Sequence, residues 1–164
     1  MKPKRTTLGS LIVALFIFCL ASLLSAPLAV GQADDVAVIV NPRSSLVNVS
    51  LGDLRKIFAG EKRSWQGGVP VKLIVRGPGC HERVVLLRLL GMSESDYKQH
   101  WTAQVMRGEA DAEPFSVPSL GMVKEAAKAF PGAIGMVDAG SVQPDMKVIK
   151  VDGHLPGEAG YPVH

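Results

Sequence analysis

The sequence predicts an α/β domain in which about four strands form one mixed sheet flanked by about four helices. Short β-branched runs, such as residues 36–40 and 133–137, have the length and composition of buried strands. Between them lie longer segments with apolar residues at helical spacing, several opened by a serine in an N-cap position. Strands that alternate with helices imply some parallel pairing, with helices on the faces of the sheet. The order of the strands does not follow from this pattern.

Residues 36–60 predict a strand followed by a helix. The β-branched run 36–40 ends at an Asn-Pro pair, which is typical of a turn. Ser50 and Asp53 form a capping-box pattern, and apolar residues recur at helical spacing from Leu51 to Phe58. Gly60 supplies a stop. We therefore expect the first helix between Ser50 and Gly60.

Residues 62–108 predict a loop, a second strand and two further helices. The loop covers 62–68, and the strand covers 69–75. The second helix opens near Gly79-Cys80 and ends at Gly91. The third opens at a capping box of Ser93 and Asp96 and ends at Gly108. Its expected apolar face consists of Tyr97, Trp101, Val105 and Met106.

The last third of the chain predicts a loop, a fourth helix and two strands. Residues 108–118 are acidic and contain two prolines, so we expect a loop. Ser119 caps a helix that runs to about Phe130, and strands follow at 133–137 and 146–151. The segment 153–164 is rich in Gly and Pro and has little to bury. We expect the domain to span 34–152 and residues 153–164 to form a flexible tail.

Residues 1–33 have the three parts of a secretory signal peptide. A basic start is followed by an almost wholly apolar run over 11–30 and by small residues before Asp34. We expect cleavage after Ala33, with a cut after Gly31 as the alternative. An uncleaved membrane anchor is the rival interpretation, because about 20 apolar residues can span a bilayer. Pro27 and the small residues favour cleavage, which predicts a periplasmic or secreted protein with no membrane insertion afterwards.

The charge and cysteine content exclude several classes of function. Three of the 18 Lys and Arg residues precede residue 34, and none of the 15 Asp and Glu residues does, so residues 34–164 are formally neutral. No basic field remains that would favour nucleic acid as a partner. Cys19 lies in the leader, which leaves Cys80 without an intrachain disulfide partner. The domain length is sufficient for one core without disulfides.

The most suggestive chemistry lies in the Gly/Pro-rich turn between the second strand and the second helix. Helix N-termini present free backbone N–H groups and bind oxyanions. Arg76, at the end of the strand, could add a bidentate donor pair for phosphate, sulfate or carboxylate. In the alternative interpretation the turn is only structural, and Arg76 pairs with Glu82 or with solvent. The turn does not match the Walker pattern, because no Gly-Lys-Ser/Thr follows it.

Other chemistries have weaker support in the sequence. Cys80 and His81 invite a nucleophile interpretation, but adjacent residues on a helix do not face each other and no orienting group is evident. The histidines have no zinc-ligand spacing, and the acidic loop around Asp111 lacks the Gly and the final Glu of a calcium loop. We expect no metal and no cofactor. The larger aromatic side chains are expected in the core: Phe58, Trp65, Tyr97, Trp101 and Phe130.

Four motifs in order resemble the phosphate-binding proteins of ABC transporters, which are members of the type II periplasmic binding protein superfamily. They are Ile57-Phe58-Ala59-Gly60, Trp65, the segment from Val75-Arg76 to Glu82, and Pro131 to Met136. The likeness spans about residues 36–138. It implies a periplasmic-binding-protein-like fold and an anion site that uses Arg76 and the backbone N–H groups of Gly79, Cys80 and His81.

The sequence also departs from that family. Full-length members have two lobes and bind the anion between them, whereas this chain looks like one lobe. Cys80 stands where the family has a serine hydroxyl, and Glu82 stands where it has a threonine. These changes remove two donors and add a negative charge. Met136 replaces the family's usual tyrosine.

Two functions follow as hypotheses. The first is an exported, non-catalytic solute-binding protein for inorganic phosphate or a similar oxyanion, with a possible envelope or transporter protein partner. The second is a ligand-free interaction module of the cell envelope that keeps the binding-protein fold. An enzyme that uses Cys80 is a third and less supported reading.

Overall fold

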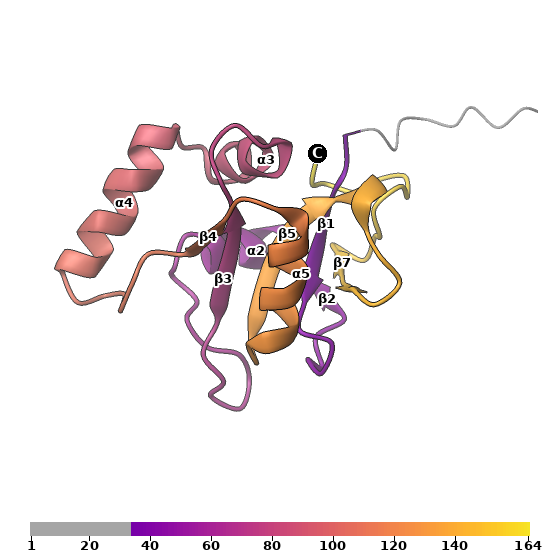
Figure 1. The fold of residues 1–164 in the computed structure, drawn as a ribbon, viewed down its shortest axis with the longest axis horizontal. Helices are drawn as coiled ribbons and strands as arrows, with labels where there is room; N and C mark the ends of the chain where they lie inside the picture. Colours follow the sequence, from indigo (N-terminus) through magenta and orange to yellow (C-terminus); the bar gives the residue numbers. More distant parts are fainter. Residues whose placement is uncertain (1–33) are drawn as a thin grey trace, which may run out of the picture. The chain divides into compact units, whose positions relative to one another are not determined.

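The computed structural model describes residues 34–164 (Figure 1). The expected signal peptide, residues 1–33, lies outside the described residues, so its cleavage remains a prediction. The helices are α2 (Leu51–Phe58), α3 (His81–Leu90), α4 (Glu94–Met106) and α5 (Leu120–Ala129), with a 3₁₀ turn at Ala139–Ser141. The strands are β1 (Val36–Val40), β2 (Asn48–Val49), β3 (Lys72–Arg76), β4 (Phe115–Val117), β5 (Ala133–Asp138), β6 (Lys147–Val148) and β7 (Lys150–Val151).

The sheet is mixed, which confirms the predicted fold class. Its five strands have the order β4-β3-β5-β1-β6, and β2 and β7 form a separate two-stranded sheet. Strand β3 is parallel to both β4 and β5, whereas β1 is antiparallel to β5 and β6. The carboxyl ends of β3 and β5, marked by Arg76 and Asp138, therefore meet at the same edge of the sheet.

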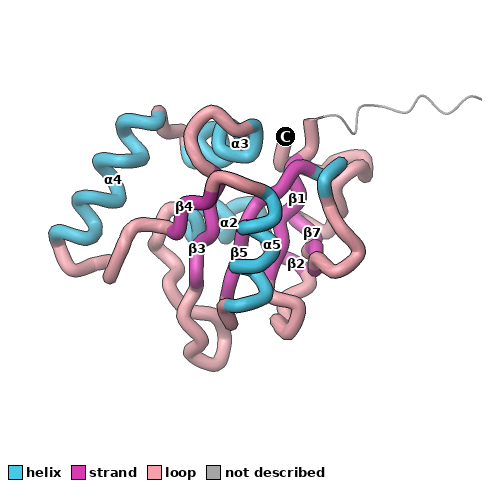
Figure 2. The backbone as a smooth tube through the Cα atoms, in the orientation of Figure 1, coloured by secondary structure: helices cyan, strands magenta, loops and turns pink. Residues whose placement is uncertain are grey.

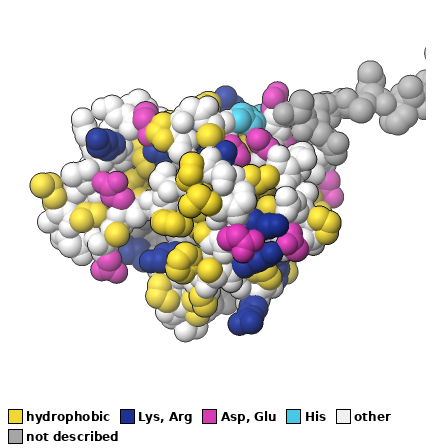
Figure 3. All heavy atoms as spheres, viewed as in Figure 1, with side chains coloured by type: hydrophobic (Ala, Val, Ile, Leu, Met, Phe, Trp, Pro, Cys, Tyr) yellow, Lys and Arg dark blue, Asp and Glu magenta, His cyan; other side chains and the backbone are white. Residues whose placement is uncertain are grey.

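Helices cover both faces of the sheet, with α5 on one face and α2 and α3 on the other (Figures 1 and 2). The strands bury side chains in alternation. In β1, Val38 packs into the core under α2 and α3, whereas Ile39 packs into the core under α5. The face seen in Figure 3 carries acidic and basic side chains next to each other. None of the helices within residues 34–164 combines the length and the hydrophobicity needed to cross a bilayer.

The helix boundaries follow the predicted capping residues. The Ser50 hydroxyl accepts a hydrogen bond from the Asp53 N–H at 3.0 Å. Ser93 and Asp96 form the full reciprocal capping box at the start of α4. Ser119 caps α5 through the Met122 N–H, and Gly91 ends α3 with a left-handed φ of 68°.

Strand prediction was less accurate. The second strand begins at Lys72 and not at 69, because residues 69–71 close the preceding loop: the Trp65 N–H donates to the Val69 carbonyl, and the Val71 N–H donates to the Arg63 carbonyl. The expected loop 108–118 contains the short edge strand β4. The expected strand 146–151 is divided between the two sheets as β6 and β7.

The tail has more to bury than the sequence suggested. The side chains of Tyr161 and Val163 are 5% and 1% exposed and belong to the core. The Tyr161 hydroxyl donates to the carbonyl of Val36 at 2.7 Å, and the Val36 N–H donates to the carbonyl of Val163 at 2.9 Å. The expectation that residues 153–164 have little to bury is therefore wrong. The tail covers the start of β1, near the C-terminus in Figure 1.

Three expected core positions are also exposed. Tyr97 and Trp101 are buried on the inner face of α4, but Val105 and Met106 near its end are 36% and 84% exposed. Gln104 takes the buried position of the last turn, at 4% exposure. Phe130 lies just beyond α5 and is 39% exposed, so it is not a core residue.

Candidate functional site

The four predicted site residues lie together, on the turn that joins β3 to α3. Arg76 is the last residue of β3, Cys80 is the N-cap of α3, and His81 is its first residue. Gly79 has a φ of 84°, which explains why glycine is needed in this turn. The turn is held to the neighbouring edge strand by the Gly77 N–H, which donates to the Val117 carbonyl at 3.1 Å.

The start of α3 has the free donors expected of an anion-binding helix terminus. Within residues 34–164, no hydrogen bond uses the backbone N–H groups of Gly79, Cys80 or His81. The Cys80 side chain provides no cap either. Nothing lies within 4 Å of the position that a Gly79 Cβ would take, so the approach to this backbone is open. The geometry suits a negatively charged group.

Arg76 itself is largely buried and contacts a carboxylate of α3. Its side chain is 13% exposed, and its Nε lies 3.3 Å from the Oε1 of Glu82, whose side chain is 6% exposed. The contact is an ion pair by distance, but Nε and Nη1 are buried without a hydrogen-bond partner of good geometry among residues 34–164. The guanidinium is therefore neutralised in charge and incompletely satisfied in hydrogen bonding.

His81 has a partner that the sequence did not identify. Its Nδ1 lies 2.7 Å from the Oδ1 of Asp138, the last residue of β5. Both side chains are partly exposed, at 37% and 43%. The parallel pairing of β3 and β5 brings Asp138 to the same sheet edge, which the sequence alone could not establish without the strand order. The sequence signal that could have found this contact is the acidic residue Asp138 directly after the predicted strand 133–137.

Among the described residues, Cys80 and His81 are neighbours on the turn but do not contact each other through a hydrogen bond. Asp138 supplies the orienting group that was missing for His81, but no hydrogen bond joins the Cys80 thiol to His81 within the described part of the chain. Cys80 is a free, half-buried thiol. Across residues 34–164, no group of three His, Cys, Asp or Glu side chains is arranged to hold a metal ion.

The fold is that of one lobe of a periplasmic-binding-protein-like domain. No protein family model matches the sequence. Solved structures with the same fold include an ABC-type phosphate transport receptor from Vibrio cholerae, at a TM-score of 0.61 and 21% identity over 75% of this chain and 48% of that one. A putative phosphate ABC transporter substrate-binding protein with bound phosphate, from Clostridium perfringens, matches at 0.60 and 18% over 75% and 47%.

A phosphate-binding protein from Stenotrophomonas maltophilia matches at a TM-score of 0.54 and 20% identity, over 75% of this chain and 40% of that chain. The chain thus spans about half the length, or less, of the binding proteins that it matches. This agrees with a short, single-lobe member of that fold. At 18–21% identity these matches concern the fold, and the ligand is a separate question.

Proposed function

We propose that this protein is an exported, non-catalytic solute-binding protein whose ligand is phosphate or a related oxyanion held at the start of α3. The anion accepts hydrogen bonds from the backbone N–H groups of Gly79, Cys80 and His81 and takes a charged donor from Arg76. The proposal rests mainly on one observation. Within the described part of the chain, the Arg76 guanidinium has N–H groups without hydrogen-bond partners, and it lies next to a helix terminus whose backbone N–H groups are free. The names of the similar structures, one of them with bound phosphate, support the same ligand class.

Export and the partner belong to this proposal. A signal peptide at 1–33 would deliver the domain to the periplasm or the medium. A transporter or another envelope protein is the proposed partner, since the similar structures include an ABC-type transport receptor. The matched region is about half of such a receptor. We propose that the same partner contributes further contacts to the ligand.

A second candidate is an interaction module that keeps the fold without the ligand. The observation in its favour is that both basic side chains of the turn have internal partners. Arg76 contacts Glu82 at 3.3 Å, and His81 contacts Asp138 at 2.7 Å. An anion would have to compete with the Glu82 carboxylate for Arg76, which weakens binding.

Thermal unfolding of the purified protein in phosphate, sulfate or chloride at matched ionic strength separates the two candidates. A ligand at 100 times its Kd stabilises the folded state by about 2.7 kcal/mol. We expect a phosphate-specific shift that disappears in Arg76→Ala, remains in the surface control Arg55→Ala, and grows in Glu82→Thr. If no anion shifts the transition, and Glu82→Thr does not create a shift, the oxyanion proposal is wrong and the interaction module is favoured.

A further inference from the structure

A cavity of about 520 Å³ lies at the opposite end of β3 from Arg76. Its walls come from the end of α2 and the following loop, the start of β3, the inner face of α4, the loop before β4 with the start of β4, and Phe130 just after α5. The length of β3 separates Lys72, on the cavity wall, from Arg76 by about 13 Å. No residue of the turn that precedes α3 lines this cavity, so it is a separate feature of the molecule.

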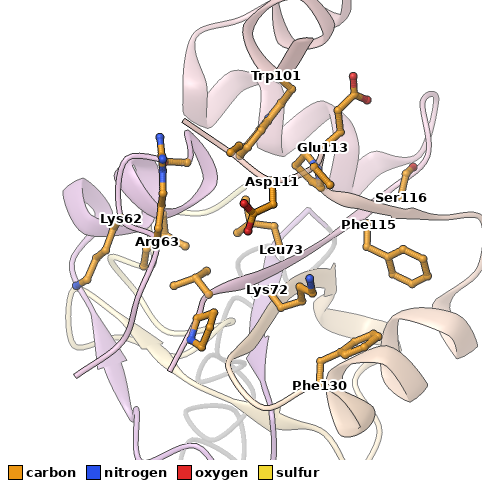
Figure 4. Close-up of a pocket in the computed structure, with 17 residues that line it drawn as sticks. Lys62, Arg63, Lys72, Leu73, Trp101, Asp111, Glu113, Phe115, Ser116 and Phe130 are labelled. Atoms are coloured by element: carbon orange, nitrogen blue, oxygen red, sulfur yellow. The ribbon is translucent and has the colours of Figure 1, made fainter. Parts of the chain in front are cut away.

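The floor and one side of the cavity are apolar. Ile57, Leu73 and Trp101 line it and are 0%, 8% and 4% exposed as whole residues. Phe115 and Phe130 stand on the other side from Lys62 and Arg63 (Figure 4). Their rings form an edge-on pair at 6.3 Å, and they are 46% and 39% exposed. An exposed aromatic pair beside a hollow gains stability when an apolar group covers it.

The charged side chains around the cavity are not paired with one another. Lys62, Arg63 and Lys72 are basic, Asp111 and Glu113 are acidic, and the side chain of Asp111 extends among the three basic ones in Figure 4. Within residues 34–164, no ion pair joins Asp111 to any of the three. Opposite charges thus border one cavity without forming ion pairs with one another in the described part of the chain. A ligand with both signs of charge would satisfy both.

Arg63 is held in position by hydrogen bonds from behind. Its Nε donates to the Gly60 carbonyl at 2.9 Å, and its Nη2 approaches the Oε1 of Gln104 at 3.5 Å. Gln104 is 4% exposed, and its amide donates to the Ala59 carbonyl at 2.7 Å. A guanidinium has five N–H donors, so this anchoring leaves others for a carboxylate. A side chain fixed in this way loses less entropy when it binds a ligand.

We propose that this cavity binds a zwitterionic small molecule with an apolar side chain, namely a free apolar amino acid or a dipeptide. The ligand carboxylate contacts Arg63 and Lys62, and its ammonium group contacts Asp111. The apolar side chain lies on Trp101 and Phe115. A cavity of this volume is within the range of small-molecule sites. Asp111 disfavours a simple anion, and the three basic groups disfavour a simple cation.

Titration calorimetry of the purified protein with matched ligands tests this proposal. The probes are L-phenylalanine and the dipeptide Phe-Leu, beside 3-phenylpropionate, which lacks the ammonium group, and phenethylamine, which lacks the carboxylate. Glycine tests the apolar side chain. We expect L-phenylalanine or Phe-Leu to bind at least about tenfold more tightly than each truncated analogue, since each lost charge-assisted contact has an effect of that order.

Three variants assign the contacts. Arg63→Gln should weaken the binding of L-phenylalanine about tenfold. Asp111→Asn should weaken it by a similar factor and should strengthen the binding of 3-phenylpropionate. Lys98→Gln, on an exposed position of α4, should leave all affinities unchanged. A thermal transition recorded for each variant establishes that it is folded. Arg76→Ala should keep L-phenylalanine binding, which separates this site from the proposed oxyanion site.

Two results would overturn the proposal. One is the absence of binding by L-phenylalanine and by Phe-Leu at millimolar concentration to the folded protein. The other is equal binding of the uncharged N-acetylphenylalaninamide, because then the charges around the cavity take no part in recognition.

Discussion

The two ends of β3 carry the same kind of side chain in different surroundings. Arg76, at the carboxyl end, is 13% exposed and contacts the buried Glu82 carboxylate. Lys72, at the amino end, is exposed and borders a cavity with Lys62, Arg63 and Asp111, among which no ion pair forms in the described chain. Burial accounts for the difference, since a buried charge requires a partner and an exposed charge is satisfied by water.

This difference bears on function because, among the described residues, the end of β3 with the recognisable motif is not the end with the unpaired charges. The Gly/Pro turn at Arg76 has the pattern of an anion site, but its cation is already neutralised by Glu82. The amino end of β3 has no recognisable motif, yet its charges remain free to contact a ligand. An internal partner and an external ligand compete for the same group, so charges without internal partners interact more readily with small molecules.

The largest expected effect tests whether the Arg76 end depends on its ion pair. Glu82→Ala leaves a buried guanidinium without its carboxylate, and we expect a loss of about 3–5 kcal/mol of unfolding free energy in urea. Asp111→Ala, the matched removal of an acid at the other end, should change it by less than about 0.5 kcal/mol.

The double variant Arg76→Met/Glu82→Leu is the control for Glu82→Ala. It removes both charges and keeps apolar volume, so its stability should return close to that of the parent protein. If Glu82→Ala costs no more than Asp111→Ala, the contact at 3.3 Å is not a structural ion pair, and the contrast between the ends of β3 fails.

Two glycines with similar backbone angles give a second, smaller contrast. Gly132, near the amino end of β3, has φ 78°, and a Cβ there would lie 2.1 Å from the Pro70 carbonyl oxygen. Gly79, at the Arg76 end, has φ 84° and no atom within 4 Å of its Cβ position. Gly132→Ala should therefore destabilise by about 2–4 kcal/mol, from strain and overlap together, and Gly79→Ala by about 1 kcal/mol, from strain alone.

Urea unfolding of both variants, with Gly140→Ala as the unstrained control, measures this contrast. Equal losses at Gly132 and Gly79 would mean that the loop carrying Pro70 moves aside without cost. In that case the wall of the cavity near Lys72 is not fixed by this contact.

Local signals in the sequence explain which parts of the fold were predictable. Ser50, Ser93 and Ser119 act within three residues of their own helix, so capping patterns located α2, α4 and α5 correctly. The edge strand β4 depends on pairing with β3, about 40 residues away in the chain, and has little local pattern of its own. The burial of residues 153–164 likewise depends on contacts with a distant part of the chain, such as the hydrogen bond between Tyr161 and Val36.

In the candidate site, too, local features were predictable from the sequence and contacts between distant parts of the chain were not. The sequence brought Arg76, Gly79, Cys80 and His81 together because they are neighbours on one turn. It also offered Glu82, in the first turn of α3, as a partner for Arg76. The contact of His81 with Asp138 needed the strand order, which the sequence does not specify. The cavity near Lys72 assembles from five separate segments and has no sequence signature.

The smallest expected effect concerns an ion pair that is intermediate between the two ends, because only one partner is buried. Arg83 on α3 is 7% exposed and donates to both carboxylate oxygens of Glu94 at 3.0 and 2.6 Å, while Glu94 is 45% exposed. These hydrogen bonds lower the pKa of Glu94 below its usual 4.5. A lowered pKa in the folded state contributes stability above the usual pKa, and this stability is lost as the pH falls through the lowered value.

Glu94→Gln should lower the unfolding free energy by no more than about 1 kcal/mol at pH 7, because the carboxylate is half exposed. The difference from the parent protein should shrink towards pH 3. Urea unfolding at several pH values measures it, with Glu125→Gln, whose carboxylate is 72% exposed, as the control that should change little at any pH. A difference that stays constant from pH 7 to pH 3 would mean that Glu94 acts through packing and not through its charge, and burial of one partner would then not be enough to make an ion pair matter.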